Sequence, residues 1–500
     1  MKAKRLWRRV PTPLALLLGL FLGLFIGRIL PPSFFGFSWA RPSTPVFLSR
    51  LSARKHFTLP DVDQRKRVLD LLSTLSPYHT AECTRNSQPL YVQQVRERYK
   101  PLVASRSPSS PSSWMPSLGL GLSDPDGLYV SPAREHKYYF AINLYNSFDI
   151  IPDLFATLFR VSAILGYHNV FVSIYENGSN DQTKALLRIF DSITKSVGLR
   201  VTIRTSTRTR GNFNHRIEYL AEVRNQAFDP LHELRDANNE FFDTIIFMND
   251  ILPCVDDVLE LIWQSRRNNA GITCAADYVY HNDLNTPVFY DNWVSRDING
   301  TALENAPFEN IFHDPESSER FQRHLPIQVQ SCWNGVAILD PAPFYSPPYV
   351  RFRMADIIEG ECSASECSLI CNDYWQAGYG RIVMVPRVKL AYDRKVFDLI
   401  HPPRRNLTAI RGYVRIGGLP DDPRYDPQDR SWFGPHDRVF DSQESEEIEF
   451  QPGPSHVWCW GWDGAGDIDG PDVDPIWEAM PSRSQTVEAV TVKHDRAFDL

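Results

Sequence analysis

The chain has 500 residues, of which 43% are hydrophobic and 23% are charged, so most of it has the composition of an ordinary globular protein. Its 53 Lys and Arg residues are outnumbered by 60 Asp and Glu residues, giving a formal charge of -7. This balance argues against a nucleic-acid-binding protein, which needs a basic face. Eight cysteines in a chain of this length are too few for a disulfide-dense miniprotein.

The N-terminus has the pattern of a membrane anchor. Residues 1–9 contain five basic residues and no acid, and an apolar run follows over residues 10–30. The run is just long enough to span a bilayer as a helix, and the basic flank places residues 1–9 in the cytosol and the rest in the lumen. A cleaved signal peptide is the alternative, because Ser38-Trp39-Ala40 resembles a cleavage site. The length of the run favours a retained anchor.

Three glycines, Gly19, Gly23 and Gly27, repeat every four residues within this run. That spacing places them on one helix face, where a second copy of the chain could approach closely and form a homodimer. The alternative is that glycine is simply common in membrane helices.

The luminal residues divide into three predicted parts. Residues 31–136 form a stem, with a helix predicted over Asp61–Leu75 and a Ser/Pro/Gly-rich linker at 105–127. Residues 137–400 form a globular domain, and residues 401–500 form an acidic extension rich in Pro and Trp. We expect this extension to pack on the domain, with aromatic stacking on an acceptor sugar as the alternative. In an oxidising lumen the cysteines are expected to form disulfides or buried thiols, and Asn177, Asn299 and Asn406 begin possible N-glycosylation sequons.

From residue 137 onward, predicted strands and helices alternate. The strands cover Tyr138–Leu144, Asn169–Tyr175, Leu199–Arg204 and Thr244–Met248, and the helices cover Ile151–Leu165, Asp181–Val197, Glu218–Phe228 and a segment starting near Val255. This alternation predicts an α/β fold with a Rossmann-type, mostly parallel sheet flanked by helices. Ligands bind such sheets beyond the carboxyl ends of the strands, so the residues that follow each strand are the candidates for a site.

The second strand is followed by the segment E-N-G-S-N-D, residues 176–181. In a nucleotide-binding loop the Glu176 carboxylate would accept hydrogen bonds from the base or ribose, and Gly178 would let backbone amides approach the ligand. An ordinary turn with Asp181 capping the next helix explains the same residues without a ligand. Taken alone, the motif favours the ordinary turn.

The fourth strand ends in Asn249-Asp250. A carboxylate at this point can hold a divalent cation that bridges a diphosphate, because Mg²⁺ and Mn²⁺ prefer oxygen ligands. A turn that opens toward the next helix is the alternative. Arg224, on the helix before this strand, could bind a diphosphate through charge-assisted hydrogen bonds, although a lone helical arginine is more often a solvated charge.

Further motifs follow in a characteristic order: F-Y-D-N-W-V-S-R-D (289–297), Q-S-C-W-N-G-V-A (330–337), S-E-C-S-L-I-C-N-D-Y-W (365–375), G-Y-G-R-I (378–382) and V-P (385–386). Together with the earlier motifs, they resemble the fungal cryptococcal α-1,3-mannosyltransferase and capsule-associated protein family, glycosyltransferase family 69. The resemblance runs from about residue 137 to about residue 393. It implies a GT-A-like fold and a type II Golgi membrane protein that transfers mannose from GDP-mannose to a glycan acceptor with a divalent metal, usually Mn²⁺.

The resemblance also implies roles for matching positions. It implies donor binding by Glu176, Asn177, Asp181, Arg224 and Asn249, an acceptor and sugar side at Trp333, Asn334 and Gly335, catalytic acids at Glu366 and Asp373, and metal ligands at Asp250 and His401. Met248 stands where GT-A enzymes commonly have the first Asp of a D-x-D motif, so only one strong metal carboxylate is visible there. Glu366 and Asp373 are seven residues apart and would share a helix face, either as a donor-sugar clamp or as a solvated edge.

Two other functions stay open at this point. One is a transferase that uses a different nucleotide sugar, such as UDP-xylose. The other is a capsule or cell-wall assembly factor that keeps the fold without catalysis, for which the missing first Asp before Asn249 is the reason.

Overall fold

The computed structural model describes residues 97–102, 136–209, 215–306, 311–359, 361, 364–401, 447–459 and 476–480, which all fall within one compact unit, Thr58–Leu500. The predicted cytosolic tail, membrane span with its three glycines, Asp61–Leu75 helix and 105–127 linker lie outside the described residues, as do Asn406 and most of residues 401–500. Among the helices that the structure does describe, none is long and apolar enough to cross a membrane.

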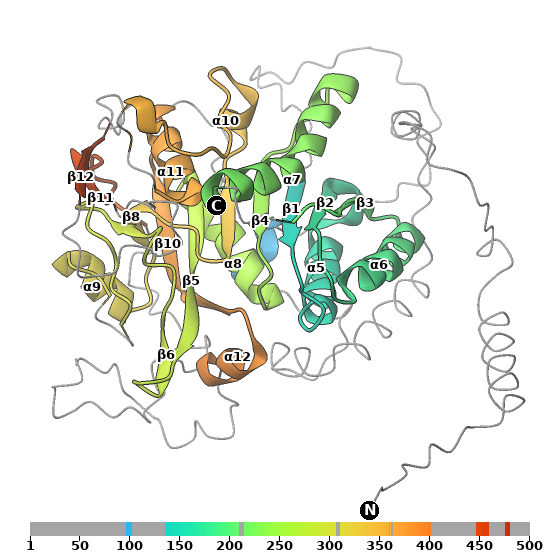
Figure 1. The fold of residues 1–500 in the computed structure, drawn as a ribbon, viewed down its shortest axis with the longest axis horizontal. Coiled ribbons are helices and arrows are strands. Elements are labelled where there is room, and N and C mark those ends of the chain that lie inside the picture. The colour runs from blue at the N-terminus through green and yellow to red at the C-terminus, as the bar shows by residue number, and fades with distance from the viewer. Residues whose placement is uncertain are drawn as a thin grey trace, which may run out of the picture. The chain divides into compact units, whose positions relative to one another are not determined.

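A ten-stranded sheet forms the centre of the described chain, in the order β3-β2-β1-β4-β9-β5-β10-β8-β7 with β6 paired to β5 (Figure 1). In chain order the strands are β1 (Tyr138–Leu144), β2 (Val170–Asn177), β3 (Arg200–Ser206), β4 (Thr244–Met248), β5 (Ile272–His281), β6 (Thr286–Phe289), β7 (Arg296–Asp297), β8 (Ile327–Ser331), β9 (Val336–Leu339) and β10 (Ile382–Ala391). β1 pairs in parallel with β2 and β4, β2 with β3, and β5 with β10. β6, β8 and β9 run against their neighbours, so the predicted mostly parallel α/β sheet is confirmed with three antiparallel strands.

Helices cover both faces of this sheet (Figure 1). The helices are α5 (Ile151–Leu165), α6 (Thr183–Val197), α7 (Arg216–Asn238), α8 (Val255–Arg267), α9 (Pro315–Gln322), α10 (Ala342–Tyr345), α11 (Glu366–Gln376) and α12 (Arg394–Ile400). Contacts join α5 to α6 and α8 on one face, and α7 to α11 on the other. Short 3-10 turns lie at η2 (Glu97–Leu102), η3 (Tyr167–Asn169) and η4 (Ile357–Glu359), and a separate hairpin joins β11 (His456–Cys459) to β12 (Ile476–Ala479).

The hydrophobic pattern placed most elements of the parallel half correctly. β1, α5 and β4 begin and end where predicted, and the ends of β2, α6 and β3 differ from the prediction by two residues or fewer. The largest difference is α7, which was predicted to end at Phe228 and instead runs through Pro230 to Asn238. A proline inside a helix removes one backbone hydrogen bond. Arg204 of β3 compensates, because its guanidinium binds Asp229 at 3.1 Å and Glu233 at 2.5 Å, on either side of Pro230.

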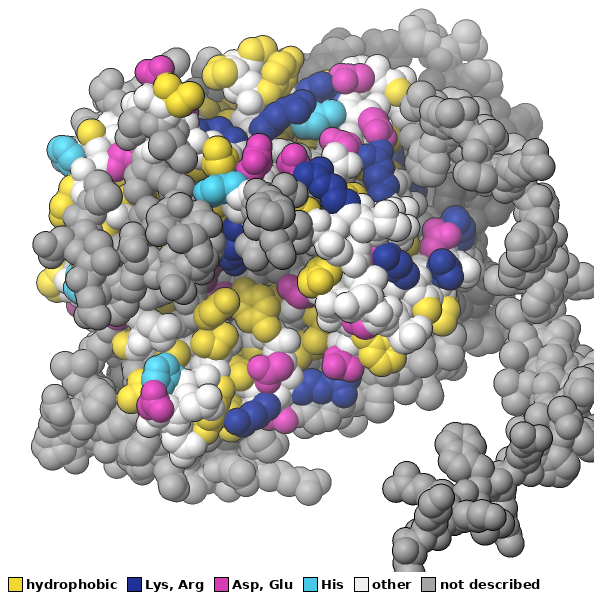
Figure 2. Space-filling model, in the orientation of Figure 1, with side chains coloured by type: hydrophobic (Ala, Val, Ile, Leu, Met, Phe, Trp, Pro, Cys, Tyr) yellow, Lys and Arg dark blue, Asp and Glu magenta, His cyan; other side chains and the backbone are white. Residues whose placement is uncertain are grey.

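Acidic and basic side chains are interspersed over α7 rather than separated into patches of one sign (Figure 2). In addition to the Arg204 pairs, the Glu240 carboxylate forms ion pairs with Arg200 at 2.7 Å and with Lys137 at 3.0 Å. Burial raises the pKa of Glu240, but these two cations outweigh it and lower the pKa to about 2. The pairs thus join the C-terminal end of α7 to β3 and to the start of β1.

Two segments outside the predicted 137–400 domain pack against it. Tyr99 of η2 donates to the buried Glu260 of α8 at 2.5 Å, so part of the predicted stem belongs to the folded unit. In the C-terminal extension, Gln328 and Gln451 exchange two hydrogen bonds, and the backbone N–H of Trp458 donates to the Gly300 carbonyl at 2.8 Å. The expected packing of the extension on the domain is therefore confirmed for residues 447–459.

We predict that Gly271→Ala destabilises the fold. A Cβ atom at Gly271 would lie 2.0 Å from the backbone oxygen of Tyr379, which cannot move away as a flexible side chain can. We expect a loss of about 1–3 kcal/mol, measured as a lower midpoint of thermal or urea unfolding. Ser192→Ala on the exposed side of α6 is the control and should leave the midpoint unchanged; equal midpoints for both variants would contradict the prediction.

Candidate functional site

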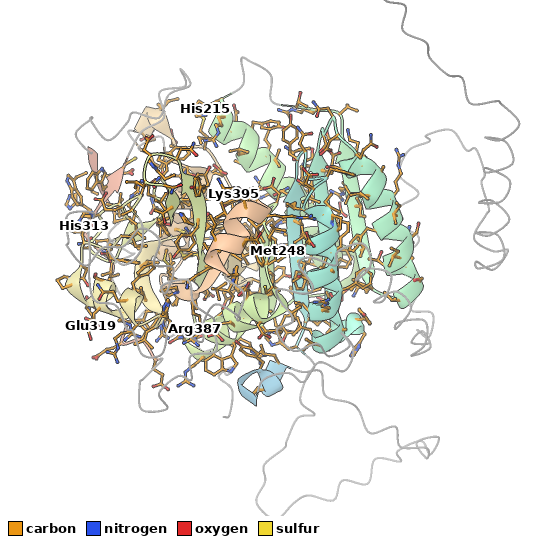
Figure 3. All side chains as sticks on the ribbon, turned by 90° about the horizontal axis from the view of Figure 1, so that it is seen from below. His215, Met248, His313, Glu319, Arg387 and Lys395 are labelled. Atoms are coloured by element: carbon orange, nitrogen blue, oxygen red, sulfur yellow. A yellow bond between two sulfur atoms is a disulfide. The ribbon has the colours of Figure 1, made fainter. Side chains whose placement is uncertain are left out.

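The carboxyl ends of β1, β2, β4, β5 and β10 meet at one edge of the sheet, because these strands run in the same direction. Figure 3 views the molecule from this side, with Met248, the last residue of β4, and Lys395 of α12 labelled near its middle. The predicted site residues that follow β2 and β4 therefore lie at the edge where α/β folds bind ligands.

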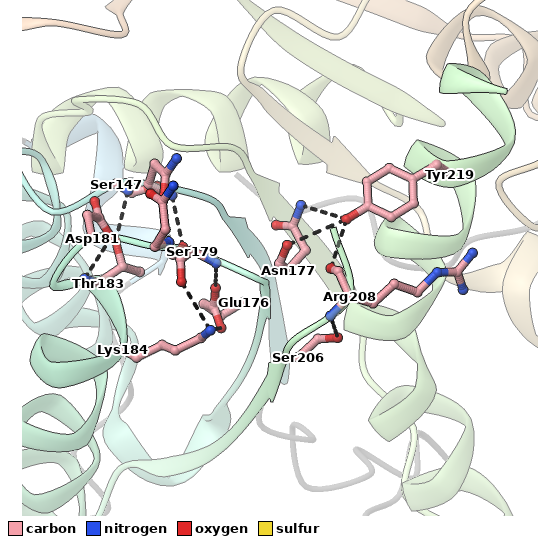
Figure 4. Close-up of polar contacts among 12 residues, drawn as sticks. Ser147, Glu176, Asn177, Ser179, Asp181, Thr183, Lys184, Ser206, Arg208 and Tyr219 are labelled. Carbon is pink, nitrogen blue, oxygen red and sulfur yellow. Dashed lines mark hydrogen bonds and ion pairs between the residues drawn. The ribbon is translucent and has the colours of Figure 1, made fainter. Parts of the chain in front are cut away.

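The turn after β2 is held together by its own polar side chains (Figure 4). Glu176 is fully buried, and its Oε1 atom accepts the backbone N–H of Ser179. Its Oε2 atom lies 3.7 Å from Lys184 Nζ and has no hydrogen-bond partner among the residues that the structure describes. The predicted donor-binding residue Glu176 thus reaches a ligand only if that buried oxygen is uncovered.

Asn177 and Asp181 also shape this turn (Figure 4). Asn177 is buried, with its Nδ2 atom 3.5 Å from the Tyr219 hydroxyl. Asp181 accepts the backbone N–H groups of Thr183 at 2.9 Å and Phe148 at 3.1 Å. Slight burial raises the pKa of Asp181, but these hydrogen bonds outweigh it and place the pKa below its ordinary value. Asp181 therefore ties the turn after β2 to the loop after β1.

Arg224 lies at the meeting point of three elements. From α7, its Nε donates to Glu366 Oε1 of α11 at 2.8 Å, and its Nη1 donates to Asn249 Oδ1, just after β4, at 3.0 Å. The side chain of Arg224 is 12% exposed and that of Glu366 only 1%. Burial acts to lower the pKa of Arg224, but the acidic groups around it, Cys367 and Glu366 foremost, raise it overall. The structure thus brings together three residues that the sequence motifs predicted separately.

Three aromatic rings enclose the Arg224 guanidinium. Its carbon lies 5.0 Å from the ring centroid of Phe247, 5.3 Å from that of Trp333 and 5.8 Å from that of Phe352. Such cation–π contacts favour a cation over a neutral group in this environment. Trp333, predicted on the acceptor side, is 1% exposed and forms one wall of this arginine cage.

Asp250 directly follows Asn249 and is half-buried at the edge of the sheet. Burial raises its pKa to about 6, and a hydrogen bond with Ser147 and the charge of Arg224 only partly oppose this. A carboxylate deprived of water, with one cation nearby, is an oxygen group whose charge a divalent ion would stabilise.

Asn334 and Gly335 form the turn before β9. Gly335 has a φ angle of +80°, and a Cβ atom there would lie 2.8 Å from Ile251 Cγ2. Its carbonyl accepts the backbone N–H of Asn249 at 2.9 Å, which fixes the residue next to Asp250. Asn334 is fully buried, so these two predicted acceptor-side residues also support the site from below.

Two acids of this region were not singled out from the sequence. Asp277, fully buried in β5, accepts Asn334 Nδ2 at 2.8 Å and the Tyr392 hydroxyl at 2.8 Å. Asp291 follows β6, and Arg224 and Glu366 both act on its pKa. A carboxylate inside the apolar run I-T-C-A-A-D-Y-V (272–279) is the signal that could have found Asp277, since burying an acid is costly.

A disulfide joins β5 to the loop that carries Trp333 and Asn334. Cys274 and Cys332 are bonded, with their Cα atoms 6.1 Å apart, and both are fully buried. Cys254 and Cys459 each take part in a disulfide as well, whereas Cys367 and Cys371 are buried free thiols. The expectation of disulfides and buried thiols is confirmed for these described cysteines.

His401 and Asp373 have partners of their own. The Nε2 atom of the buried His401 lies 3.0 Å from the Lys389 carbonyl oxygen, and its ring packs on Phe397. Across the described ranges, no group of three or more His, Cys, Asp and Glu side chains is arranged to hold a metal ion.

Arg353 binds Asp373 through two hydrogen bonds of 2.8 and 2.9 Å. The two predicted catalytic acids of α11 therefore bind different arginines, Glu366 to Arg224 and Asp373 to Arg353.

The Arg353 pair generates a stability prediction. Arg353 also binds Glu361, and these hydrogen bonds raise the pKa of Arg353 and join the loop before α11 to the helix. Asp373→Asn should lower the free energy of unfolding by about 1–2 kcal/mol, measured by urea denaturation. Glu319→Gln, which breaks the exposed pair with Arg323, is the control and should cost under about 0.5 kcal/mol. Equal losses would mean that the Asp373 pair is no stronger than a surface pair.

Two solved structures that resemble this chain are distant from it in sequence. Mannosyltransferase PcManGT from Pyrobaculum calidifontis, in complex with GDP-Man and Mn²⁺, is 11% identical, covering 65% of this chain and 68% of that chain, with a TM-score of 0.30. GalNAc-T7 with UDP, GalNAc and Mn²⁺ is 13% identical, covering 52% of this chain and 44% of that chain, with a TM-score of 0.31. Likeness at this level carries no argument about function.

Comparison with protein sequences gives a closer result. Residues 137–373 match the family described as Cryptococcal mannosyltransferase 1. Alpha-1,3-mannosyltransferase CMT1 of Cryptococcus neoformans var. neoformans serotype D is 36% identical over 285 residues, which cover 54% of this chain and 60% of that protein, so the match spans less than two thirds of the relative. Residues 137–373 of this chain are therefore similar to the cryptococcal mannosyltransferase family.

Proposed function

We propose that this protein transfers mannose from GDP-mannose to a glycan acceptor and forms an α-1,3 linkage. The family match and the activity named for the relative support the sugar and the linkage. The single observation that carries the proposal is the placement of Arg224 between Glu366 and Asn249, beside Asp250, at the carboxyl edge of the sheet. A nucleotide diphosphate needs such a combination of a fixed cation and a metal-binding acid.

In this proposal Arg224 binds the diphosphate of the donor. Its Nε and Nη1 atoms hold Glu366 and Asn249, and its Nη2 atom makes no hydrogen bond to any residue that the structure describes. The Nη2 donors are therefore available for phosphate oxygens. Glu366 acts as a positioning residue, because its carboxylate fixes the guanidinium.

Asp250 would hold a divalent cation, in our proposal Mn²⁺. Its half-buried carboxylate fits a hard cation, whereas the Nε2 atom of His401 is bound to a backbone carbonyl. When bound, such a cation neutralises the charge that develops on the leaving diphosphate. The Arg224 guanidinium and the Gly335 carbonyl hold Asn249, the residue next to Asp250, from its side chain and its backbone.

We also propose a single-pass type II Golgi membrane protein, anchored by residues 10–30, with the folded unit in the lumen. The basic flank and apolar run of the sequence support the anchor. The buried Cys274–Cys332 disulfide is consistent with folding in an oxidising lumen. Gly19, Gly23 and Gly27 would provide a dimer face within the span.

We predict that Asp250→Asn lowers transfer from GDP-mannose at least about 100-fold, because it removes the charged oxygen ligand of the cation. Wild-type protein should lose activity in EDTA and recover it with Mn²⁺. Asp191→Asn in the exposed Lys195 pair of α6 changes net charge equally and should retain full activity. Full activity of Asp250→Asn, or of the wild type in EDTA, would refute the metal assignment.

The same assay separates the alternatives for the donor. Incubating purified protein and Mn²⁺ with GDP-mannose, UDP-xylose and other nucleotide sugars should give nucleotide release and transfer only with GDP-mannose. Selective use of UDP-xylose would replace the proposed donor. A folded, nucleotide-binding protein that consumes no donor would instead support a non-catalytic assembly factor.

We predict that Arg224→Ala weakens GDP binding by about 1.5–3 kcal/mol, as expected for a lost charge-assisted bond. The single variant also leaves the buried Glu366 carboxylate without its cation, which costs stability. The double variant Arg224→Ala/Glu366→Gln removes that unpaired charge and should regain thermal stability without regaining GDP affinity. Recovery of GDP binding in the double variant would mean that Arg224 acts only by neutralising Glu366.

A further inference from the structure

The two acids that were not singled out from the sequence form a pair, in which Asp277 is fully buried and Asp291 is half-buried. Asp277 comes from β5 and Asp291 from the segment after β6, and the backbone N–H of Asp291 donates to Asp277 Oδ1 at 3.3 Å. Asn334 touches both acids: its Nδ2 donates to Asp277 Oδ1 at 2.8 Å, and its backbone N–H lies 3.4 Å from Asp291 Oδ2. Two carboxylates this close, with little water around them, resist ionising together.

The hydrogen bonds decide which acid of the pair is charged. Asp277 accepts three donors: Asn334 Nδ2, the Tyr392 hydroxyl and the Asp291 backbone N–H. From the described residues, the Asp291 carboxylate accepts one longer bond, from the Asn334 backbone. Because donors that point at a carboxylate stabilise its charged form, the negative charge belongs on Asp277 and a shared proton belongs on Asp291.

The titration behaviour of the surrounding groups agrees with this arrangement. Burial first, and then the charge of Asp277, raise the pKa of Asp291 to about 7. Burial together with both acids raises the pKa of Tyr392, so its hydroxyl keeps the proton that it donates to Asp277. Tyr290, beside Asp291, also has a raised pKa, through burial and then through Asp291 and Asp277.

Other charged groups from four elements face this pair. Arg224 of α7 opposes the rise in the pKa of Asp291, and Glu366 of α11 adds to it. Burial lowers the pKa of Arg296 in β7 to about 10, and the charge of Asp291 partly opposes this. Asp250 after β4 and Arg216 of α7 act on the same region through Tyr290. Four carboxylates, those of Asp250, Asp277, Asp291 and Glu366, thus act in one region together with the cation of Arg224, whose side chain is 12% exposed.

If all four of these acids were ionised, their negative charges would repel a nucleotide diphosphate. A proton kept on one of them removes one negative charge and supplies a hydrogen-bond donor. Asp291 is the member of the pair that is half-exposed, whereas Asp277 is fully buried. The retained proton therefore lies on the acid that can face a ligand.

We infer that Asp291 is a further donor-site residue that carries a proton, held there by Asp277, and that nucleotide diphosphate binding depends on this proton. The inference rests on the proposed function, because it takes a nucleotide diphosphate as the ligand. Asp277, Asn334 and Tyr392 are positioning residues in this arrangement, since they act through Asp291.

The test is calorimetric binding of GDP with Mg²⁺ between about pH 6 and pH 8.5. Wild-type affinity should fall by up to about tenfold per pH unit once Asp291 loses its proton, because one proton is then taken up with each GDP. Asp291→Asn is uncharged at every pH and keeps an N–H donor, so it should bind GDP without that loss. The titration of the phosphate of GDP itself is common to both proteins and cancels in their comparison.

Two variants sharpen the comparison. Asp277→Asn removes the neighbouring charge, so Asp291 should ionise more easily and the loss of GDP affinity should begin at a lower pH than in the wild type. Asp191→Asn in α6 changes the net charge by the same amount at a position outside the acid pair, so it should reproduce the wild-type pH profile. Infrared difference spectra, wild type minus Asp291→Asn, should show a protonated carboxyl band at pH 6 that disappears at alkaline pH.

The outcomes separate this inference from the proposed function. An Asp291→Asn protein with the wild-type pH profile, or one that loses GDP binding at every pH, would overturn the inference, as would the absence of the infrared band. A wild-type protein that binds GDP at no pH would refute the proposed function, and the infrared band would still report whether Asp291 holds the proton.

Discussion

The buried charge of Arg224 is the constraint around which this part of the molecule is organised. A guanidinium that is almost removed from water needs a counter-charge and hydrogen-bond acceptors, and it obtains them from Glu366 and Asn249. Because these partners come from α11 and from the end of β4, the pairing joins the helices over one face of the sheet to its edge. Phe247, Trp333 and Phe352 then close the space around the cation.

The strand β9 connects this charge to the acid pair. Running antiparallel between β4 and β5, it brings the turn that precedes it to both neighbours. At that turn Gly335 accepts from Asn249, while Asn334 binds Asp277 and Asp291. One short loop therefore holds both Arg224, through Asn249, and the Asp277–Asp291 pair. The Cys274–Cys332 disulfide joins this loop to β5.

Local sequence was enough to predict the parallel half of the fold, because β1 and β4 are short, continuous apolar runs and α5 has apolar residues at helical spacing. The same reasoning ended α7 too early, since a partner on β3 offsets the effect of Pro230. Motifs also indicated Arg224, Asn249, Asp250 and Glu366 as site residues. The Asp277–Asp291 pair was not predicted, because it depends on β9 lying between β4 and β5. The spacing of strands and helices along the sequence does not reveal this antiparallel insertion.

The described part of the C-terminal extension has a consequence for how the folded unit can be divided. Gly453 packs so closely on the indole of Trp375 that a Cβ atom would lie 2.9 Å from the ring, and Arg296 donates to the Trp458 carbonyl at 2.5 Å. A shortened protein ending near residue 401 would uncover a tryptophan of α11, leave the Arg296 guanidinium short of an acceptor, and break both bonds of Gln328. We therefore expect the boundary of an autonomously folding fragment to lie beyond Cys459, inside an extension whose composition alone resembles a dispensable tail.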